Sequence, residues 1–486
     1  MTRKSVGLFA VGPARLLSGL GEAERLDRVE HLAVHGALPE VRPEELIALA
    51  ENVNLCGRGG AGFPFARKLK AVIDSSARRG GRAAVVVNGS EGEPTCLKDA
   101  TLLSRAPHLV LDGALLAADA LGAEEIVVGV TRTELERSVS AAIAERGPGW
   151  PSIRVELLPE RFVTGEGTAL TNGLNTGTAL PPGRKVRTSD SGLRGMPTLL
   201  SNTETFAQLA VAARMGALSY REAGLPSEPG TTLLTVAGSW VVETPTGVPV
   251  ADILQMCGTD PGQGVLVGGY HGGWLAPGAA RAALISRESL TIFGGSLGAG
   301  AILPLPLDTC PLGEVVRVAR WMAEESAGQC GPCVRGLPAL ASALARVVEG
   351  SRTDAMNKVR DLLDSVRGRG ACSHPDGTAR FITSALTAFP DDLKDHRYGL
   401  GCGRAVLGVL PLGDDVPGSS DQFERLLVDW TLCAGHGLCA HMLPDVVQLG
   451  ADGYPASAQM RLPESQHVQG LRAVRRCPAL ALRIEA

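Results

Sequence analysis

Two separate sets of three cysteines constrain this chain more than any other feature of its sequence. The sets are Cys330, Cys333 and Cys372 and, nearer the C-terminus, Cys433, Cys439 and Cys477. Thiolate sulfur binds iron–sulfur clusters, and a usual binding sequence combines cysteines two residues apart with a remote cysteine that is followed by proline. Ala327 and His436 stand where further cysteines of that spacing would fall. Each set therefore predicts an iron–sulfur site with one ligand missing.

Length and composition indicate a folded protein of several domains. The chain has 486 residues, more than one hydrophobic core normally serves, and its formal net charge is −4. This charge gives no basic stripe for a phosphate backbone, so nucleic acid is not an expected partner. The sequence has no run of about 18 uncharged apolar residues, which predicts no membrane span. Eleven cysteines without a secretion signal favour a reducing, cytoplasmic location.

The pattern of apolar residues predicts an α/β region, a β-rich region and a helical region, in that order. Periodicity and turn residues predict helices over 42–53, 65–76, 250–256, 314–325 and 336–348. Short apolar runs between turns predict strands over 83–87, 126–130, 154–158, 233–237, 264–267 and 290–293. Residues 411–421 have the turn-rich, polar composition of a linker.

A glycine-rich segment follows the first predicted helix. Gly57, Gly59 and Gly62 match the spacing of the dinucleotide-binding fingerprint, but that fingerprint follows a strand and this segment follows a helix. Three glycines ahead of a helix N-terminus still let backbone N–H groups approach a phosphate or the edge of a flavin. The alternative is a structural turn without a ligand.

Polar side chains gather where the predicted strand over 83–87 ends. Asn88, Ser90, Glu91 and Glu93 follow that strand, and Lys98 comes shortly afterwards. Because α/β proteins bind ligands at the carboxyl ends of their strands, this segment predicts a site. The alternative is a solvated loop that caps the next helix.

Together with residues 165–170 and 197–205, these motifs resemble the flavin-bearing subunit of respiratory complex I. That subunit binds FMN and oxidises NADH, and its family also serves NAD-linked hydrogenases and formate dehydrogenases. The resemblance covers roughly residues 40–390, and it implies that Glu91 and Glu93 lie near the nicotinamide as candidate catalytic residues. The implied cofactor-binding residues are Gly57, Arg58, Gly59, Gly60, Gly62, Phe63, Lys68, Asn88, Ser90, Glu166, Arg184 and Asn202.

One departure from the family concerns the choice of nucleotide. The family usually has Gly-Glu-Glu where this chain has Gly165, Glu166 and Gly167, and a later loop of this chain carries Arg184 and Arg187. Loss of an acid and gain of cations favour a 2′-phosphate, because arginine pairs with phosphate through two parallel hydrogen bonds. The expected nucleotide is therefore NADH or NADPH.

The second cysteine set lies in a segment, about residues 424–486, that resembles the single-cluster bacterial ferredoxins that often serve cytochrome P450 systems. Relatives of that type without the central cysteine, here replaced by His436, usually carry a 3Fe-4S cluster. The resemblance implies a 3Fe-4S or 4Fe-4S cluster at Cys433, Cys439 and Cys477. A zinc site built from three cysteines and His436 is the alternative.

The first cysteine set departs from the complex I family, which has a cysteine in place of Ala327. This site therefore holds a 3Fe-4S cluster, takes a ligand from elsewhere or holds no cluster, and zinc is the competing metal. His374 is the nearest replacement ligand, and the alternative is a histidine in a surface loop. The remaining cysteines, Cys310 and Cys402 among them, lack partners at ligand spacing and are expected to be buried small hydrophobes.

The resemblance implies a multidomain α/β protein with six parts. These are an N-terminal segment (1–40), an FMN- and nicotinamide-binding α/β domain (41–224), a β-grasp module (225–310), a helical iron–sulfur domain (311–410), a linker (411–423) and an α+β ferredoxin-like domain (424–486).

The function implied is that of a flavin-dependent NAD(P)H dehydrogenase. A hydride carries two electrons and a cluster accepts one, so FMN would convert between them. Electrons would then pass through the iron–sulfur centres and the fused ferredoxin domain to a redox protein or partner subunit, such as a cytochrome P450 or another component of an oxidoreductase. Two alternatives stay open, namely a non-catalytic electron-relay subunit of a larger complex and a zinc-stabilised redox scaffold.

Overall fold

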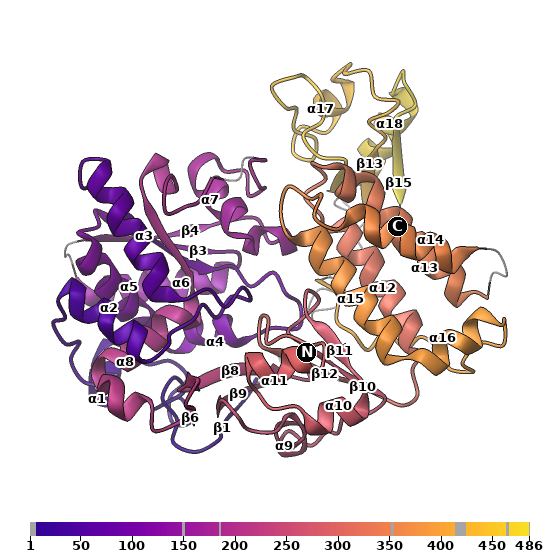
Figure 1. Ribbon diagram of the computed structural model, residues 1–486. Coiled ribbons are helices and arrows are strands. Elements are labelled where there is room, and N and C mark those ends of the chain that lie inside the picture. The colour runs from indigo at the N-terminus through magenta and orange to yellow at the C-terminus, as the bar shows by residue number, and fades with distance from the viewer. Residues whose placement is uncertain are drawn as a thin grey trace. The chain divides into compact units, whose positions relative to one another are not determined.

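The computed structural model describes residues 6–147, 151–183, 186–350, 354–413, 424–462 and 466–485 (Figure 1). These residues form two compact units, one ending at residue 413 and one beginning after it. Each unit has a hydrophobic core of its own. Among the described helices, none is both long and apolar enough to cross a membrane.

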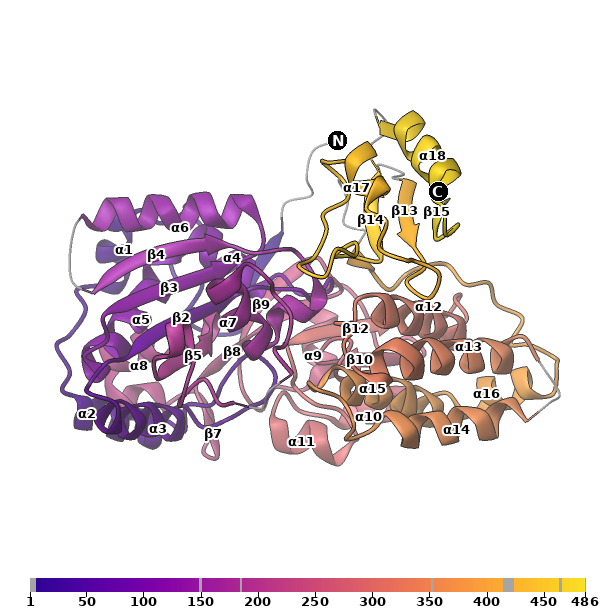
Figure 2. The ribbon, with the colours of Figure 1, turned by 90° about the horizontal axis from the view of Figure 1, so that it is seen from above.

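The larger unit contains a four-stranded parallel sheet with helices on both faces (Figure 2). Its strand order is β4-β3-β2-β5, and the strands lie side by side in Figure 2. Alternate residues of β2 enter different cores, since Val85 and Val87 pack on the side of α5 and α8 whereas Ala84 and Val86 pack on the side of α7. The strands are β2 (Ala84–Gly89), β3 (Glu125–Val130), β4 (Ser152–Leu157) and β5 (Thr198–Asn202). The helices are α1 (Arg28–His35), α2 (Pro43–Asn52), α3 (Phe65–Arg78), α4 (Lys98–Arg105), α5 (Pro107–Leu121), α6 (Thr133–Arg146), α7 (Gly167–Thr176) and α8 (Thr203–Tyr220), with short 3₁₀ turns η1 (Phe162–Gly165) and η2 (Leu193–Gly195).

A six-stranded mixed sheet follows in the same unit, with the order β1-β9-β8-β12-β10-β11. Its strands are β1 (Gly7–Ala10), β8 (Thr231–Val236), β9 (Trp240–Pro245), β10 (Gly264–Val267), β11 (Gly273–Leu275) and β12 (Ala301–Leu305). A small hairpin and three short helices complete this region, namely β6 (Gly224–Leu225), β7 (Glu228–Pro229), α9 (Val250–Met256), α10 (Pro277–Ala282) and α11 (Arg287–Ile292).

The last part of the larger unit is helical. Four of its helices pack on one another around an apolar core, as Figure 1 shows. The helices are α12 (Pro311–Glu324), α13 (Leu337–Val348), α14 (Ala355–Val366), α15 (His374–Ala388) and α16 (Pro390–Arg397), with a π-helical turn, η3 (Pro332–Gly336), before α13.

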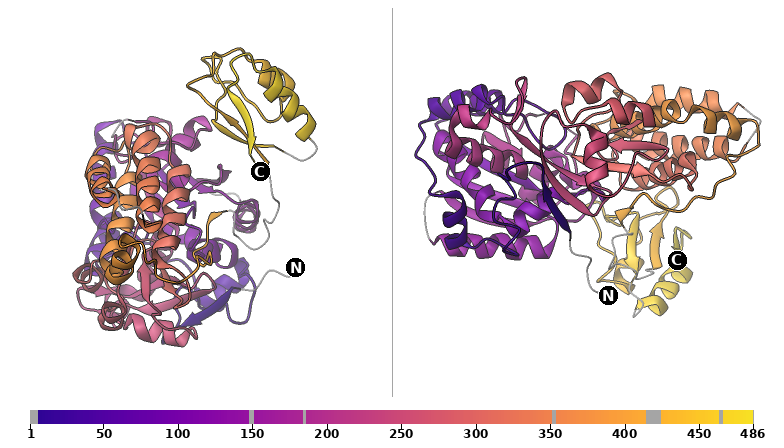
Figure 3. Two further views of the ribbon diagram at one scale, coloured as in Figure 1. Left: turned by 90° about the vertical axis from the view of Figure 1, so that its right-hand side faces the viewer. Right: turned by 90° about the horizontal axis from the view of Figure 1, so that it is seen from below.

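The smaller unit combines a three-stranded antiparallel sheet with two helices, drawn in yellow in Figure 3. Its strand order is β14-β13-β15. The elements are β13 (Glu424–Val428), α17 (Leu438–Met442), β14 (Gln459–Leu462), α18 (His467–Arg476) and β15 (Leu482–Glu485). The three cysteines of the second set pack against its core.

Most of the predicted elements are confirmed, and one is wrong. The helices predicted over 42–53, 65–76, 250–256, 314–325 and 336–348 correspond to α2, α3, α9, α12 and α13. Residues 290–293, predicted as a strand, instead belong mostly to α11, because Ser286 caps that helix by accepting a hydrogen bond from the Ser289 N–H. Strand β1 was not predicted, and it pairs with β9 from more than 200 residues away.

Candidate functional site

Motifs from separate parts of the sequence meet at one edge of the four-stranded sheet. Asn88 in β2 and Asn202 in β5 are register partners on adjacent strands. Asn88 Nδ2 donates to the Gly165 carbonyl over 2.9 Å, which brings η1 and the start of α7 to the same edge. The glycine-rich segment lies there too, since a Cβ on Gly59 would be 3.1 Å from the Asn202 Cβ. This is the edge at which parallel α/β sheets bind ligands.

The glycine-rich segment forms a tight turn before α3. Gly57 N donates to the Phe63 carbonyl over 2.9 Å, and Gly60 and Gly62 have φ angles of +110° and +61°. A Cβ on Gly62 would also lie 2.9 Å from Arg287 Nε, so both strain and lack of space disfavour a side chain there. Gly59 and Gly60 are exposed. Their backbone can therefore be approached closely by a cofactor.

Ser90 presents a buried hydroxyl that the protein does not satisfy. Its backbone N–H donates to Asn88 Oδ1 over 3.1 Å, but its Oγ has no hydrogen-bond partner among the described residues. Buried polar atoms are normally paired, and an unpaired one indicates a missing ligand or water. Glu166 lies nearby and caps α7, where its carboxylate accepts the N–H groups of Thr168 and Ala169 over 2.9 Å each.

A network of buried charges supports this edge of the sheet. Lys98 is 2% exposed, and its Nζ lies 2.8 Å from Asp99 Oδ1, 3.1 Å from Glu204 Oε2 and 3.3 Å from Asn202 Oδ1. Burial alone would lower the pKa of Lys98, but the two carboxylates outweigh it and hold the pKa above its usual value. The guanidinium of Arg58 lies at 3.9 Å from Glu204 on the other side. Asn202 is therefore positioned by groups that are themselves fixed.

Glu91 and Glu93, the candidate catalytic residues, are both held by donors of the protein. Glu91 accepts the N–H groups of Asp99 and Ala100 at the start of α4, over 2.9 and 3.0 Å. Glu93 accepts the Tyr270 N–H and the Thr95 hydroxyl, each over 2.8 Å. Arg132 also lies 3.3 Å from Glu91. These contacts orient the carboxylates, and their role toward a nucleotide stays a prediction.

The pKa of Glu93 gives a pH dependence that can be measured. Burial raises this pKa from 4.5 to about 7, so the folded protein binds the proton more tightly than the unfolded chain does. The resulting stability is present below pH 4.5 and is lost as the pH rises through 7, by about 3 kcal/mol. We expect Glu93→Gln to flatten the fall in unfolding free energy between about pH 5 and 8. Chemical denaturation at several pH values in this range measures the unfolding free energy, and Glu22→Gln, at an exposed position, is the control. If the free energy of Glu93→Gln falls with pH as steeply as that of the wild type, the raised pKa of Glu93 is contradicted.

The other predicted cofactor residues lie around the same segment, with one exception. Phe63 is 46% exposed, so its ring is accessible to a ligand, and the Arg67 guanidinium lies over the ring at 5.7 Å from its centroid. Lys68 Nζ donates to the Leu200 carbonyl over 2.8 Å, and burial lowers its pKa. Arg58 is buried, and its backbone N–H donates to Thr205 Oγ1 over 2.9 Å. Arg184 lies outside the described residues.

The first cysteine set converges beside η3. The Sγ atoms of Cys330 and Cys333 are 3.5 Å apart. Burial, followed by the proximity of Cys330 and Cys372, raises the pKa of Cys333 to about 12. Cys372 lies close enough to contribute to this shift. Thiols bind metal only by losing their protons, and a metal centre supplies the positive charge that this requires.

His374 does not complete this set, and it is not a surface residue either. It is buried, its Nε2 contacts the Met322 carbonyl at 2.7 Å, and its Nδ1 contacts His271 Nε2 at 3.1 Å. Both ring nitrogens are therefore engaged, which argues against the replacement ligand and contradicts the surface alternative. Ser326 offers a hydroxyl oxygen beside the set, because its side chain hydrogen-bonds to Cys333. Ser326 immediately precedes Ala327, the residue that replaces the family cysteine.

The sheet edge and the first cysteine set are adjacent. The loop that leads to Glu166 packs on the cysteine-bearing segment, since Phe162 N donates to Glu325 Oε2 over 2.9 Å and Arg161 Nη2 donates to the Ser326 carbonyl over 3.0 Å. The pKa of Cys372 is raised, mainly by burial. The backbone N–H of His374 works in the opposite direction, and the negative charge of Glu166 adds to the rise. The two sites therefore lie close enough to influence each other electrostatically.

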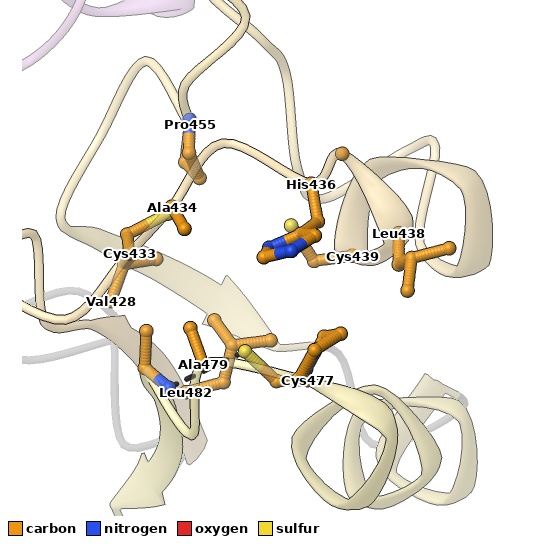
Figure 4. A pocket seen from close by; sticks show the side chains of 13 residues that line it. Val428, Cys433, Ala434, His436, Leu438, Cys439, Pro455, Cys477, Ala479 and Leu482 are labelled. Carbon is orange, nitrogen blue, oxygen red and sulfur yellow. Dashed lines mark hydrogen bonds between the residues drawn. The ribbon is translucent and has the colours of Figure 1, made fainter.

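The second cysteine set lines one pocket of the smaller unit. Cys433, Cys439 and Cys477 surround this pocket together with His436, and Figure 4 shows their side chains directed toward a common space. Cys477 Sγ also accepts the Ala481 N–H over 3.3 Å. N–H donors of this kind stabilise a thiolate and tune a cluster bound to it. Three thiols around an apolar pocket fit an iron–sulfur cluster.

Fold and candidate sites together define the class as a multidomain α/β protein, with a candidate cofactor site at the sheet edge of the larger unit and one set of three cysteines in each unit. Comparison with known families agrees. Residues 50–211 match the family described as the Nuo51 FMN-binding domain, residues 314–396 match the NADH-ubiquinone oxidoreductase-F iron–sulfur binding region, and residues 426–484 match the 4Fe-4S single cluster domain.

Individual relatives point the same way. The chain is 29% identical over 389 residues to the F subunit of NADH-quinone oxidoreductase from Streptomyces coelicolor, which covers 74% of this chain and 84% of the relative. It is also 29% identical to the F subunit of NADH-quinone oxidoreductase from Mycobacterium tuberculosis, covering 74% of this chain and 86% of the relative. A crystal structure of an NAD⁺-reducing [NiFe]-hydrogenase in the H₂-reduced state matches with a TM-score of 0.69 and 25% identity, covering 81% of this chain and 68% of that one. The chain is therefore similar to F subunits of NADH-quinone oxidoreductase over about three quarters of its length.

Two groups of residues could not be found from the sequence. Lys98 and Glu204 lie within the recognised motifs, but only the fold shows that they form an ion pair next to Asn202. Cys310 and Cys402 have no partners at ligand spacing in the sequence, but the fold brings both close to His396. Cys310 is buried as expected, whereas Cys402 is only partly buried. No short spacing signals that group, since the two cysteines come from opposite ends of the helical region.

Proposed function

We propose that this chain oxidises NADH or NADPH at an FMN bound to the edge of the parallel sheet and passes electrons on through iron–sulfur centres. The observation that carries the proposal is the meeting of the glycine-rich segment, Asn88, Ser90 and Asn202 at one edge, directly beside the first cysteine set. The homology to the F subunits of NADH-quinone oxidoreductase and the matched FMN-binding domain support it.

In this proposal the protein contributes binding and orientation. FMN, when bound, supplies the conversion between the two electrons of a hydride and the single electrons that clusters accept. The backbone of Gly59 and Gly60 and the hydroxyl of Ser90 would hold it, and the exposed ring of Phe63 would hold the nucleotide. Lys98 and Glu204 act as positioning residues, because they fix Asn202 and do not line the edge themselves.

We also propose the finer division of the chain and its electron route. Residues 41–224 would form the FMN- and nicotinamide-binding domain, 225–310 the β-grasp module, 311–410 the helical iron–sulfur domain and 424–486 the ferredoxin-like domain. Electrons would pass from the first cysteine set to the second and then to a partner subunit. The relatives give no support to a cytochrome P450 as the acceptor, whereas their names place them in multi-subunit oxidoreductases.

Steady-state kinetics of the purified holoprotein test the proposal. We expect nicotinamide-dependent reduction of ferricyanide, an artificial acceptor that can take electrons directly from a flavin. Comparison of NADH with NADPH decides whether the cationic loop favours a 2′-phosphate, and a strong NADH preference would reject NADPH. Protein that contains stoichiometric iron but no FMN, and that oxidises neither nucleotide, would instead indicate a relay subunit.

Replacement of Cys330 separates flavin chemistry from onward transfer. We expect Cys330→Ser to lose the iron of the first set, because its thiol lies 3.5 Å from Cys333 and provides one of only three cysteines there. Reduction of ferricyanide should persist, whereas reduction of the clusters of the smaller unit by NADH should slow. Iron analysis and cluster EPR measure both, with Ser326→Ala testing the neighbouring hydroxyl. Unchanged iron content in Cys330→Ser would show that the first set holds no cluster.

A further inference from the structure

We propose that Cys310, His396 and Cys402 bind one zinc ion, at a site separate from both iron–sulfur sets. Sγ of each cysteine and a ring nitrogen of the histidine lie within 4.8 Å of one another, which places them around a common point. Cys310 Sγ and His396 Nε2 are 3.3 Å apart. Cys310 and His396 are only 2% and 6% exposed, so the group is built into the fold.

The imidazole of His396 is oriented as a metal ligand. Its Nδ1 lies 2.6 Å from the Val348 carbonyl, which accepts only, so Nδ1 carries the proton. Nε2 is then the basic nitrogen, and it is the atom that lies 3.3 Å from Cys310 Sγ. Histidines that bind metals almost always donate their other N–H to a carbonyl or carboxylate in this way.

The two cysteines are placed so that a cation would stabilise their charged form. Cys310 caps α12, and its sulfur accepts the Gly313 N–H over 3.3 Å, an arrangement that favours a thiolate. Burial and the neighbouring Cys402 work against that charge and raise the pKa of Cys310 to about 11. A divalent cation bound between the sulfurs would reverse this effect, because metal binding displaces the thiol protons.

The chain segment that carries Cys402 is held against α12 by the backbone. Cys310 N donates to the Ala405 carbonyl over 2.8 Å, and the N–H groups of Gly408 and Val409 donate to Glu314 Oε1 over 2.6 and 3.3 Å. A metal bound by Cys402 together with Cys310 and His396 would connect this segment to helices α12 and α16.

The ligand chemistry favours zinc. Two thiolates and one imidazole match the sulfur and nitrogen donors of tetrahedral zinc, and no carboxylate of the described residues joins the three. The fourth tetrahedral position would be left to water or a small ligand. An iron–sulfur cluster needs more thiolate ligands than this group offers. The competing chemistry is a disulfide between Cys310 and Cys402, which peptide mapping detects.

X-ray absorption at the zinc edge tests the proposal on the intact holoprotein, because iron does not contribute to that edge. We expect about one zinc per chain, with about two sulfur ligands near 2.3 Å and a nitrogen ligand near 2.0–2.1 Å. Three sulfur ligands would instead place zinc in an iron–sulfur set and overturn the proposal. Absence of zinc, or a Cys310–Cys402 disulfide found by non-reducing peptide mapping, would overturn it as well.

Two variants and a matched control localise the ion. Cys402→Ser and His396→Gln should each lose most of the zinc while retaining iron and FMN, because neither residue belongs to those sites. Cys257→Ser removes a free cysteine that is partly exposed at the end of α9, and it should keep the zinc. Zinc retained in both Cys402→Ser and His396→Gln would refute the site. If a variant fails to fold, the zinc-edge spectrum of the wild-type protein still decides.

Discussion

Cys433→Ser is expected to abolish the cluster of the smaller unit while leaving nicotinamide oxidation intact. Only three cysteines line the pocket, so loss of one leaves too few thiolates for a cluster. All three also pack against a small core, and domains of this size often depend on a bound metal centre for stability. We expect loss of this unit's iron and of its separate melting transition. Iron analysis and EPR measure the cluster, and NADH-dependent ferricyanide reduction should stay near the wild-type rate.

His436→Ala is the matched control, because His436 lines the same pocket from an exposed position. Three cysteines alone would hold a 3Fe-4S cluster, and the variant should then keep its cluster and EPR signal unchanged. Loss of the cluster in His436→Ala would identify the imidazole as a ligand. Iron retained by Cys433→Ser would show that the three thiols do not form one site.

Lys98→Met is expected to destabilise the larger unit by about 3–5 kcal/mol, the usual cost of removing one partner from a buried ion network. Asp99 would lose its close cation and Glu204 the nearer of its two cations, while both carboxylates remain buried. Asn202 would lose a donor at the edge where FMN is proposed to bind. We therefore expect weaker retention of FMN as well, measured as flavin released on gel filtration, alongside chemical denaturation for stability.

Lys70→Met provides the comparison for this change. Lys70 pairs with Glu51 on the surface, where both side chains are about half exposed, and such pairs contribute about 0–1 kcal/mol. This variant should keep both its stability and its flavin. Equal stability of Lys98→Met and Lys70→Met would contradict the buried network as a support of the site.

The cofactor edge could be predicted from the sequence because its signals are local. Gly57 to Gly62 precede a helix, and Asn88 ends a strand, so each motif could be placed on an element without knowledge of the fold. The resemblance then related motifs that are far apart in the chain. What it could not supply is the pairing of Lys98 with Glu204, because contacts across 106 residues depend on how α4 and α8 pack.

The errors have physical causes of the same kind. Residues 290–293 are apolar enough for a strand, but the cap at Ser286 starts a helix that buries Leu290 in the core. His374 follows Cys372 closely, and its burial between Met322 and His271 follows only from tertiary packing. The local sequence pattern predicts which side chains are buried. The residues that they contact depend on how distant elements pack together.

Anaerobic addition of NADH to the purified holoprotein, followed by visible absorbance and low-temperature EPR, tests the central claim most directly. We predict that the flavin absorbance bleaches and that the EPR signals of the iron–sulfur centres change to those of their reduced states in the same sample. In Cys433→Ser the flavin should still bleach, and the signal of the smaller unit should be missing. A flavin that stays oxidised with NADH and with NADPH, in protein that contains FMN and iron, would contradict the account.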